Sequence, residues 1–338
     1  MSARARLIAD FLAGAGWAGA RRRVLAADAS FRRYERVARG GEQAVLMDAP
    51  PPRENVHAFH TVAQALLDLG FSAPRPLALD RANGLMLLED LGDRTFTRAL
   101  AEGADERALY LLATDVLVAL HRRWRPEDSP LTHLPRFDEA RLGDELEVLL
   151  DWAWPALCGA PAPKAVRASW ATAWGAVLGR AHGVPDTLVL RDYHVDNLME
   201  LETRQGVAAC GLLDFQDALI GPVSYDVVSL LEDARRDVSP DVVADMRARY
   251  LDAFPDLDRA AFDDSYTVLG AQRAARIIGV FTRLSRRDGK HQYLRHIPRL
   301  WRLLEAGLAR PVLAPVKSWF DREIPAKKRL APRPEAAP

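Results

Sequence analysis

Three oxygen-bearing side chains follow one another between Leu188 and Asp217, and their types and spacing suit one kind of chemistry. Asp192 and Asn197 stand five residues apart, and Asp214 follows in a second stretch that reads Leu-Leu-Asp-Phe. A carboxylate on a tight loop can orient an attacking hydroxyl, while an amide oxygen and a second carboxylate can hold magnesium against phosphate oxygens. Phosphoryl transfer requires this placement and charge neutralisation rather than covalent participation of the protein. The three residues therefore indicate magnesium-dependent phosphoryl transfer.

The order of the three residues assigns a role to each. The spacing from Asp192 to Asn197 is that of the catalytic loop H-R-D-x-x-x-x-N, in which the aspartate accepts the substrate proton and the asparagine binds magnesium. Asp214 opens a variant of the D-F-G element and is the second predicted magnesium ligand. The alternative is two unrelated acidic turns, because Asp and Asn are ordinary turn formers. Both halves follow short apolar runs, at 187–190 and 211–213, which favours the catalytic interpretation.

The elements around these residues are predicted as strands in the first part of the chain and as helices in the rest. Alternating and helical spacings of apolar residues, hairpin breakers and one Asn-Gly turn carry this prediction. The expected fold class is α+β, with a small antiparallel sheet and a larger helical part. The predicted strands are a first one that starts at Arg23, followed by 31–37, 44–47, 76–79 and 85–89. The predicted helices are 7–12, 56–69, 95–101, 106–123, 137–152, 162–182, one that starts at Pro222 or Val223, 241–253, 259–283 and 292–309.

Several stretches resemble the aminoglycoside phosphotransferase-like kinase family. They are Asp-Tyr-His-Val-Asp-Asn-Leu-Met (192–199), Leu-Leu-Asp-Phe-Gln-Asp-Ala (212–218), Gly-Pro-Val-Ser-Tyr-Asp-Val (221–227), Asp-Ala-Ser-Phe-Arg-Arg-Tyr (28–34), Met-Asp-Ala-Pro-Pro (47–51) and Leu-Leu-Glu-Asp-Leu-Gly-Asp-Arg-Thr (87–95). Within this family the sequence is most similar to the anomeric N-acetylmuramate/N-acetylglucosamine kinases of bacterial cell-wall recycling. The resemblance implies a bilobal protein kinase-like fold, with an N-lobe over 1–90 that carries a nucleotide-covering hairpin and a C-lobe over 91–323 that carries the catalytic loop and the acceptor site. Residues 324–338, rich in Pro, Ala and charge, are predicted to form a disordered tail.

The resemblance implies ATP and Mg²⁺ as cofactors, with two groups of nucleotide contacts. Residues 29–32 lie where a kinase has its phosphate-covering loop, so a hydroxyl, backbone amides and an arginine could contact phosphates there. The alternative is a hairpin tip with solvated arginines. The hinge of this fold binds adenine through its backbone at the end of strand 85–89, where a plain charged turn is the alternative. The implied nucleotide-binding residues are Ser30, Phe31, Arg32, Arg33, Glu89 and Leu91.

The chain departs from the kinase pattern in strand 44–47. Met47 stands where V-A-I-K has the lysine that binds the α and β phosphates and pairs with a helix glutamate. A nearby arginine could supply the charge, because Arg32 and Arg33 project to opposite faces of a strand and one of them must face the nucleotide. Our prediction is Arg33. Glu54 could replace the helix glutamate, but without a lysine partner we predict that it interacts with the helix N-terminus.

The resemblance implies that the acceptor is an N-acetylated amino sugar phosphorylated at its anomeric hydroxyl, which is acidic enough for a carboxylate base. Glu145 and Trp152, seven residues apart, place a carboxylate and an indole on one predicted helical face, as a sugar site requires; a core stripe with solvated acids has the same pattern. Arg273 and Arg276 lie in an apolar helix and suit a lactyl carboxylate or a local acid. The candidate acceptor residues are His194, Asp217, Glu145, Trp152, Arg273 and Arg276.

Two other functions fit parts of the sequence. A kinase for another small acceptor, such as an aminoglycoside or homoserine, has the same catalytic residues, although an aminoglycoside needs a strongly acidic pocket and the arginines near Arg273 argue against one. A pseudokinase that only binds nucleotide is suggested by Met47. Intact Asp192, Asn197 and Asp214 argue against the pseudokinase.

Composition excludes several classes of partner. Lys plus Arg equals Asp plus Glu, at 46 each, so no basic field for nucleic acid or an anionic membrane is expected. Cys158 and Cys210 are too few for a disulfide scaffold, and Asp10 interrupts the only apolar N-terminal run, so a cytoplasmic protein without signal peptide or membrane span is predicted. Gly14–Gly19 matches G-x-G-x-x-G but follows a predicted helix, which excludes a dinucleotide site. The sequence predicts a small-molecule partner and leaves the oligomeric state open.

Overall fold

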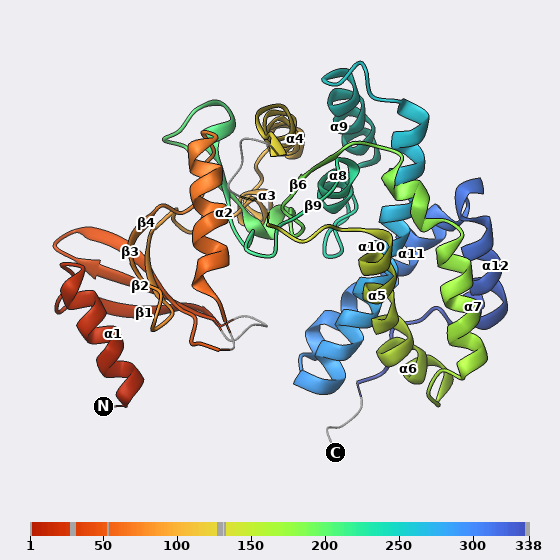
Figure 1. The fold of residues 1–338 in the computed structure, drawn as a ribbon, viewed down its shortest axis with the longest axis horizontal. Helices are drawn as coiled ribbons and strands as arrows, with labels where there is room; N and C mark the ends of the chain where they lie inside the picture. Colours follow the sequence, from red (N-terminus) through yellow and green to blue (C-terminus); the bar gives the residue numbers. More distant parts are fainter. Residues whose placement is uncertain (1, 28–31, 53, 127–130, 132, 335–338) are drawn as a thin grey trace. The chain divides into compact units, whose positions relative to one another are not determined.

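The computed structural model describes residues 2–27, 32–52, 54–126, 131 and 133–334. These residues group into two units (Figure 1). The first, here called the sheet unit, comprises residues 1–133 and 190–218. The second, here called the helical unit, comprises residues 134–189 and 219–338.

The sheet unit is built on five antiparallel strands in the order β1-β2-β3-β5-β4. The predicted Asn-Gly turn joins β4 to β5, and only glycine fits there: Gly84 has φ +64°, and a Cβ would lie 2.1 Å from the carbonyl oxygen of Ala49. The four strands predicted with both bounds are confirmed within two residues at each end. The strands are β1 (Arg21–Ala27), β2 (Arg33–Arg39), β3 (Glu42–Asp48), β4 (Pro76–Asp80) and β5 (Leu85–Glu89).

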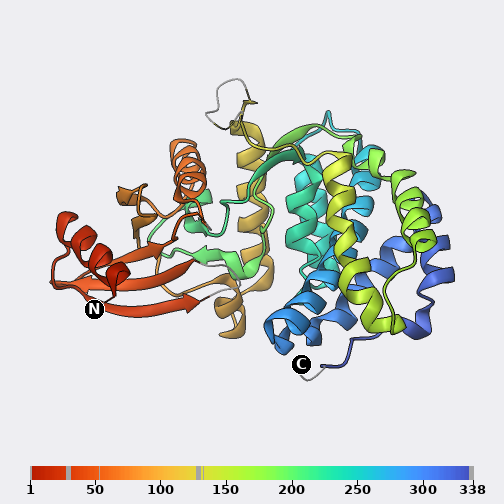
Figure 2. The same cartoon turned by 60° about the horizontal axis from the view of Figure 1, so that its bottom comes forward.

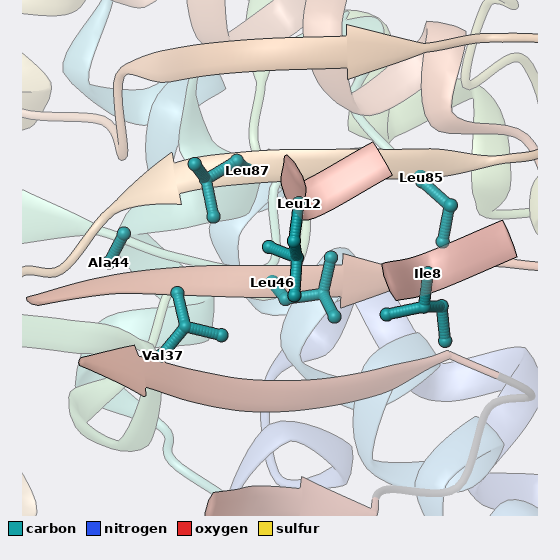
Figure 3. Packing of buried hydrophobic residues seen from close by; sticks show 7 residues of the cluster. All are labelled: Ile8, Leu12, Val37, Ala44, Leu46, Leu85 and Leu87. Atoms are coloured by element: carbon teal, nitrogen blue, oxygen red, sulfur yellow. The ribbon is translucent and has the colours of Figure 1, made fainter. Parts of the chain in front are cut away.

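Helix α1 (Ala3–Gly14) covers one face of this sheet. Ser2 caps the helix by accepting a hydrogen bond from the amide of Ala5. Ile8 and Leu12 lie over alternate residues of β2, β3 and β5, and each buried aliphatic side chain stabilises the fold by about 1.5–3 kcal/mol (Figure 3). The cluster consists of Ile8, Leu12, Val37, Ala44, Leu46, Leu85 and Leu87.

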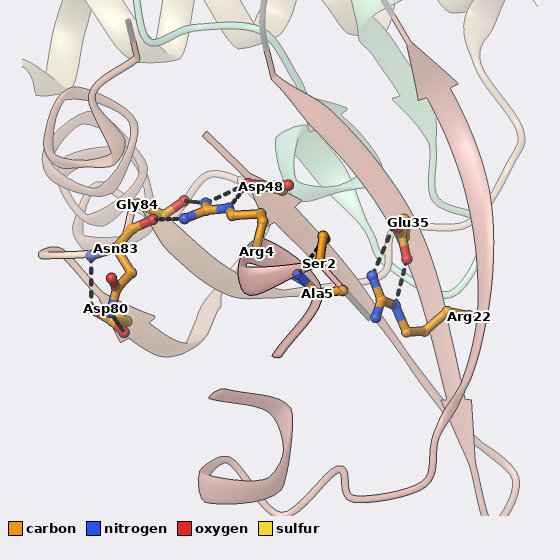
Figure 4. A network of polar contacts seen from close by, with 9 residues as sticks. All are labelled: Ser2, Arg4, Ala5, Arg22, Glu35, Asp48, Asp80, Asn83 and Gly84. Atoms are coloured by element: carbon orange, nitrogen blue, oxygen red, sulfur yellow. Dashed lines mark hydrogen bonds and ion pairs between the residues drawn. The ribbon is translucent and has the colours of Figure 1, made fainter. Parts of the chain in front are cut away.

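A polar network fastens the start of α1 to the same face (Figure 4). Arg4 forms an ion pair with Asp48 at the end of β3 and donates to the carbonyl oxygen of Asn83 at 2.6 Å. Arg22 of β1 pairs with Glu35 of β2 at 2.6 Å on this face. Odd-numbered residues of β2 therefore point toward α1.

Helix α2 (Val56–Asp68) lies on the opposite side of the sheet (Figure 1). Asn55 caps it by accepting from the amide of His57 at 2.8 Å, and its buried face includes Phe59, Val62 and Leu66. This confirms the predicted amphipathic helix. The even-numbered residues of β2 therefore point to the side of the sheet that α2 covers.

The segment 190–218 belongs to the sheet unit because its hairpin is bonded to that unit's other elements. Strands β7 (Leu198–Glu200) and β8 (Cys210–Leu212) pair with each other, and the amide of Leu212 donates to the carbonyl of Ser72 at 2.8 Å. Helices α3 (Phe96–Ala101) and α4 (Glu106–Arg123) complete the unit. Contacts between α4 and β8 and between α3 and β7 hold the hairpin in place.

The helical unit surrounds α10 (Arg259–Asp288), which contacts α5, α8 and α11 (Figures 1 and 2). Gly279 allows a close approach, since a Cβ there would lie 2.5 Å from the backbone of Val148. A cluster of indoles, including Trp170 and Trp319 with ring centroids 4.5 Å apart, fills the space between α7 and α12. The remaining elements are α5 (Glu139–Val148), α6 (Trp154–Cys158), α7 (Lys164–Gly175), α8 (Ser224–Leu231), α9 (Pro240–Asp252), α11 (Ile297–Leu308), α12 (Ala314–Glu323), β6 (Asp186–Val189) and β9 (Leu219–Pro222).

Two expectations about the chain's organisation differ from the structure. The two units do not follow the lobe boundary expected at residues 90 and 91, because α3, α4 and 190–218 group with the sheet; that boundary stays a prediction. The disordered tail expected from residue 324 is wrong for its first part. Arg329 bonds to Glu305 and Asp321, and Trp301 donates to the carbonyl of Leu330. Within the described part of the chain, no helix is long and apolar enough to cross a membrane.

Candidate active site

The loop that carries Asp192 has an unusual backbone. Arg191 has φ +73°, a left-handed conformation that non-glycine residues rarely adopt, and the amide of Asp192 donates to the carbonyl of Leu190 at 2.9 Å. Such conformations are unfavourable by about 1–3 kcal/mol and concentrate at functional sites. The tight turn at Arg191 therefore sets the direction of the Asp192 side chain.

Asn197 is oriented by the same loop. Its amide nitrogen donates to the carbonyl of Asp192 at 2.9 Å and lies 3.4 Å from Nε2 of His194. The nitrogen end of this amide faces the loop, so the oxygen end is the one that can serve as a ligand to a hard cation. His194 is only 4% exposed, and this burial favours a positioning role over direct contact with an acceptor.

The loop is anchored to α4 by Tyr193. This residue is 2% exposed, and its hydroxyl donates to the carbonyl of Ala113 at 2.8 Å. On the other side, Thr97 of α3 donates to the carboxylate of Asp196. These two bonds fix the loop that carries Asp192 and Asn197 from both flanks.

Asp214 meets the loop through the backbone and has a second strained conformation. The amide of Leu213 donates to the carbonyl of Asn197 at 2.9 Å, and Asp214 has φ +58°. Gln216 donates from Nε2 to Asp214 at 2.8 Å and to Asp217 at 3.3 Å. Asp217 thus shares a donor with the predicted metal ligand, and Gln216 holds the Asp214 carboxylate in place.

A pocket of about 250 Å³ within the sheet unit joins these residues to the sheet. Its walls are largely apolar, its polar end is formed by Asn197 and Asp214, and residues 89–92 line the end of β5. A β-bulge between Val24 and Ala26 turns Leu25 toward it. The apolar wall residues include Leu25, Val45, Phe59, Leu88, Met199 and Leu213. An apolar pocket with a polar end suits a nucleotide, whose base is apolar on its faces and whose phosphates are charged.

The residues 89–92 are held by ion pairs. Arg36 of β2 bonds to both Asp90 and Asp93 and donates to the carbonyl of Gly92 at 3.1 Å. The hydrogen bond to Asp90, followed by that to Asp93, raises the pKa of Arg36 above its usual range, and Arg36 lowers the pKa of Asp93. These contacts hold the chain between β5 and α3 in one conformation.

Glu89 and Leu91 both line the pocket, where the hinge prediction places them. The Glu89 carboxylate accepts a hydrogen bond from Arg204, and the backbone amide of Glu89 donates to the carbonyl of Arg75 at 2.8 Å. The Glu89 side chain therefore braces the hinge toward the hairpin β7–β8, and any contact with a base is left to backbone groups.

Arg32 lies on the pocket side of the sheet and Arg33 on the α1 side, the reverse of our prediction. Arg32 lies 3.4 Å from the carboxylate of Glu54 and 4.0 Å from that of Asp214. Arg33 is exposed and shares the α1 side with Glu35, so the preference for Arg33 as the arginine facing the nucleotide is wrong. The sequence shows that the two residues alternate but not which side α1 covers. Ser30 and Phe31 lie outside the described residues.

Met47 is fully buried and stands opposite Tyr34 and Met86. It lies on the same side of β3 as Val45, which lines the pocket, so the position that holds lysine in V-A-I-K has no charge here. Glu54, just before the Asn55 cap, is paired with Arg32 in addition to lying near the start of α2.

Asn197 and Asp214 fit a magnesium ion with bound phosphates. Both offer oxygen, both line the same pocket, and magnesium commonly takes only one or two protein carboxylates together with phosphates and water. Among the described residues, no group of three or more His, Cys, Asp or Glu side chains is placed to enclose a metal ion. A shared site with phosphate is therefore the arrangement that these ligands support.

The other candidate acceptor residues belong to the helical unit. Arg276 pairs with Glu145 at 3.0 Å, which is the local-acid alternative. Glu145 also lines a groove of about 590 Å³ beside α5. Arg273 is 4% exposed and donates to the carbonyl of Glu232 at 3.5 Å. A π-helical turn at Leu149–Ala153 interrupts the predicted helix 137–152, so the spacing of seven no longer implies that Glu145 and Trp152 share a face.

Sequence reasoning missed Gln216, Arg36 and Tyr193 as supporting residues. Arg36 and the acids it binds are more than fifty residues apart, and Tyr193 acts through a backbone carbonyl of another helix. Only Gln216 carried a local signal, because an amide two residues after a predicted metal ligand can reach its carboxylate.

Comparison with known proteins finds close relatives of the chain. The family model described as "Phosphotransferase enzyme family" matches residues 21–262. A Caulobacter vibrioides protein named N-acetylmuramate/N-acetylglucosamine kinase is 39% identical over 354 residues, covering 95% of this chain and 97% of that protein. A Pseudomonas aeruginosa protein of the same name is 39% identical over 300 residues, covering 85% of this chain and 84% of the relative.

Solved structures extend the likeness to the fold. Choline kinase LicA from Streptococcus pneumoniae has a TM-score of 0.61 and 14% sequence identity, and the match covers 91% of this chain and 99% of that one. The predicted α+β, protein kinase-like fold is confirmed.

Proposed function

We propose a specific reaction for this chain, which belongs to the phosphotransferase enzyme family and is a small-molecule kinase. The reaction is transfer of the γ-phosphoryl group of ATP, with magnesium, to the anomeric hydroxyl of N-acetylmuramate, N-acetylglucosamine or both, in the cytoplasm. One observation carries the choice of acceptor: four relatives with this kinase name are 35–39% identical over 81–95% of the chain. The pocket that joins an apolar slot to Asn197 and Asp214 supports the choice of a nucleotide.

The geometry of the sheet unit suits the nucleotide half of the reaction. Val45, Leu88, Met199 and Leu213 would form the apolar walls around the base, and residues 89–92 line the same pocket. The triphosphate would extend toward Asn197 and Asp214, which would hold magnesium. When bound, magnesium neutralises charge on the β and γ phosphates.

Asp192 acts on the acceptor. Its carboxylate takes the proton of the anomeric hydroxyl while the hydroxyl oxygen bonds to the γ-phosphorus and the bond from phosphorus to the β,γ-bridging oxygen breaks. The products are the sugar 1-phosphate and ADP, and the proton leaves Asp192 for solvent. An anomeric hydroxyl is a better acid than an ordinary alcohol, so a carboxylate is a sufficient base.

The acceptor contacts in the helical unit remain part of the proposal. Glu145, which lines a groove beside α5, and its ion-pair partner Arg276 offer a hydrogen-bond acceptor and a cation to a sugar with a lactyl group. Arg273 is more deeply buried, which makes Arg276 the better candidate of the two. Trp152 and Asp217 complete the proposed set of acceptor contacts, and buried His194 is proposed to position the loop that carries Asp192.

The proposal is tested with purified protein, ATP and magnesium against N-acetylmuramate, N-acetylglucosamine, kanamycin, homoserine and choline. Phosphorus NMR is expected to show a phosphate coupled to the anomeric proton for one or both amino sugars. The matched control is N-acetylmuramitol, the reduced sugar that lacks an anomeric hydroxyl, which should remain unmodified. Phosphorylation of the reduced sugar, or of another acceptor only, contradicts the proposal, and nucleotide binding without any product supports the pseudokinase alternative.

A further inference from the structure

The sheet unit lacks the lysine that usually neutralises the nucleotide phosphates, and the structure indicates a replacement. Met47 occupies its position and is fully buried among apolar neighbours. We propose that Arg32, positioned by Glu54, is the cation that binds the nucleotide phosphates. This rests on the proposed function in one respect only, namely that the ligand is a nucleoside triphosphate.

The position of Arg32 carries the inference. The guanidinium lies between two carboxylates, with Nε 3.4 Å from Glu54 and Nη2 4.0 Å from Asp214. Its side chain is 12% exposed, so it is drawn into the protein rather than extended into solvent. Asp214 lines the pocket at its polar end, where the phosphates of a bound nucleotide must lie if magnesium is held there.

The strand pattern explains why Arg32 and not its neighbour has this position. Tyr34, two residues later, lines the pocket, whereas Glu35 and Val37 lie on the α1 side. Side chains two residues apart in an extended chain share a face, so Arg32 falls on the pocket side and Arg33 on the other. Arg33 is thus a natural control, with the same charge one residue away.

Glu54 takes the part that the helix glutamate has toward lysine in the usual arrangement. It stands directly before Asn55, the N-cap of α2, so a helix on the pocket side of the sheet sets its position. A carboxylate bound at Nε leaves the Nη groups of the guanidinium directed to the Asp214 side. An arginine can bind a carboxylate on one edge and phosphate on another, which the point charge of a lysine cannot do with the same geometry.

The first experiment measures equilibrium binding by calorimetry and needs no acceptor. Adenosine and a non-hydrolysable ATP analogue with magnesium are titrated into wild type, Arg32→Ala and Arg33→Ala. Arg32→Ala is expected to lower the affinity for the ATP analogue by about 100-fold, the usual scale for a lost charged donor, and to leave the affinity for adenosine nearly unchanged. Arg33→Ala should change neither affinity by more than about twofold, as for an exposed charge.

Three results overturn the inference. They are an Arg32→Ala variant that binds the ATP analogue like wild type, an equal loss for adenosine and the analogue, and an equal loss in Arg33→Ala. A thermal unfolding scan of each variant accompanies the titrations, so that an unfolded protein is recognised. Arg32→Lys keeps the charge and is expected to retain an intermediate affinity, because the compact ammonium of lysine lacks the planar fork with which arginine reaches Glu54 and phosphate at this position.

The second experiment tests whether Glu54 acts through Arg32. Glu54→Gln alone is expected to lower the affinity for the ATP analogue by about tenfold. In the Arg32→Ala background the same substitution should cause no further loss of affinity, as for residues that act as a unit. Additive losses in the double variant show that Glu54 is not the positioning residue. If no amino sugar is phosphorylated but Arg32→Ala still loses affinity for the ATP analogue, the proposed acceptor is wrong and the inference about Arg32 stands.

Discussion

The sheet unit and the helical unit use their charged residues in different ways. In the sheet unit, Asp192, Asn197 and Asp214 lie on loops with left-handed backbone at Arg191 and Asp214 itself, and Asn197 and Asp214 line the pocket. In the helical unit, Arg273, Arg276 and Glu232 lie on or beside helices and are held by partners within the unit. Polar side chains that line a pocket next to strained backbone indicate a functional site. Charged side chains that are paired along helices also contribute to packing and stability.

The largest expected effect is at the base. Asp192→Asn keeps the shape of the side chain and removes its ability to accept a proton, so kcat should fall by about 10²–10⁴-fold with little change in nucleotide affinity. Steady-state kinetics and calorimetry on the same preparation measure both quantities. A near wild-type kcat in this variant would show that Asp192 is not the base.

The next effect concerns magnesium. Asp214→Ala should reduce the affinity for the ATP analogue in the presence of magnesium to the value measured without it, a loss of about 100-fold for a missing charged ligand. Asp217→Ala is the matched control, since Asp217 shares the Gln216 donor and is more exposed. Equal losses in the two variants mean that the turn as a whole, and not Asp214, binds the metal.

A buried carboxyl in the helical unit should affect stability without affecting chemistry. Burial raises the pKa of Glu232 from 4.5 to about 7, against the opposing effects of a hydrogen bond from Tyr266 and of Arg273, Arg247 and Arg299. Between these two pKa values the folded state binds more protons than the unfolded state. The free energy of unfolding therefore falls by up to roughly 3 kcal/mol as the pH rises from about 4.5 to 7, and it levels off above pH 7.

Glu232→Gln, which stays neutral, should remove this slope and leave kcat near pH 7 unchanged. Urea unfolding from pH 4.5 to 8 for both proteins measures the slope. A wild-type free energy of unfolding that does not fall over this range contradicts the raised pKa of Glu232.

The hinge should give a smaller effect of a different kind. Arg36→Ala leaves Asp90, which is 7% exposed, without its ion pair and loosens residues 89–92. We expect the affinities for adenosine and for ATP to fall by the same factor, about tenfold, whereas Arg32→Ala should lower only the affinity for ATP. Arg22→Ala, which removes an exposed pair on the α1 side, is the control. A loss confined to ATP shows that Arg36 acts on the phosphates and not on the hinge.

The smallest effect separates acceptor binding from packing in the helical unit. Arg276→Gln should raise KM for N-acetylmuramate by about tenfold and KM for N-acetylglucosamine by no more than about twofold, because only the first has a lactyl carboxylate to pair. Competition kinetics between the two sugars measure the ratio directly. An equal rise for both sugars assigns Arg276 to its pair with Glu145 alone.

What the sequence pattern could predict differs between the two units for a physical reason. The candidate catalytic loop is continuous in sequence, so Asp192, Asn197 and Asp214 could be proposed as site residues from their spacing and from the apolar runs before them. The candidate acceptor residues in the helical unit come from separate helices, and a π-helical turn after Val148 changes the helical phase, so the period that related Glu145 to Trp152 did not hold.

Residue types, their alternation and their local order determined the strands, the Asn-Gly turn, the capped helix after Asn55 and the chemistry expected at 188–217. Only the tertiary structure decided which face of the sheet α1 covers, and with it that Arg32 and not Arg33 lies beside Asp214. It also decided that Arg36 reaches Asp90 and that residues 324–330 pack against α11 and α12. Alternation along a strand is a local property, whereas the assignment of its two faces depends on which distant helix packs on each of them.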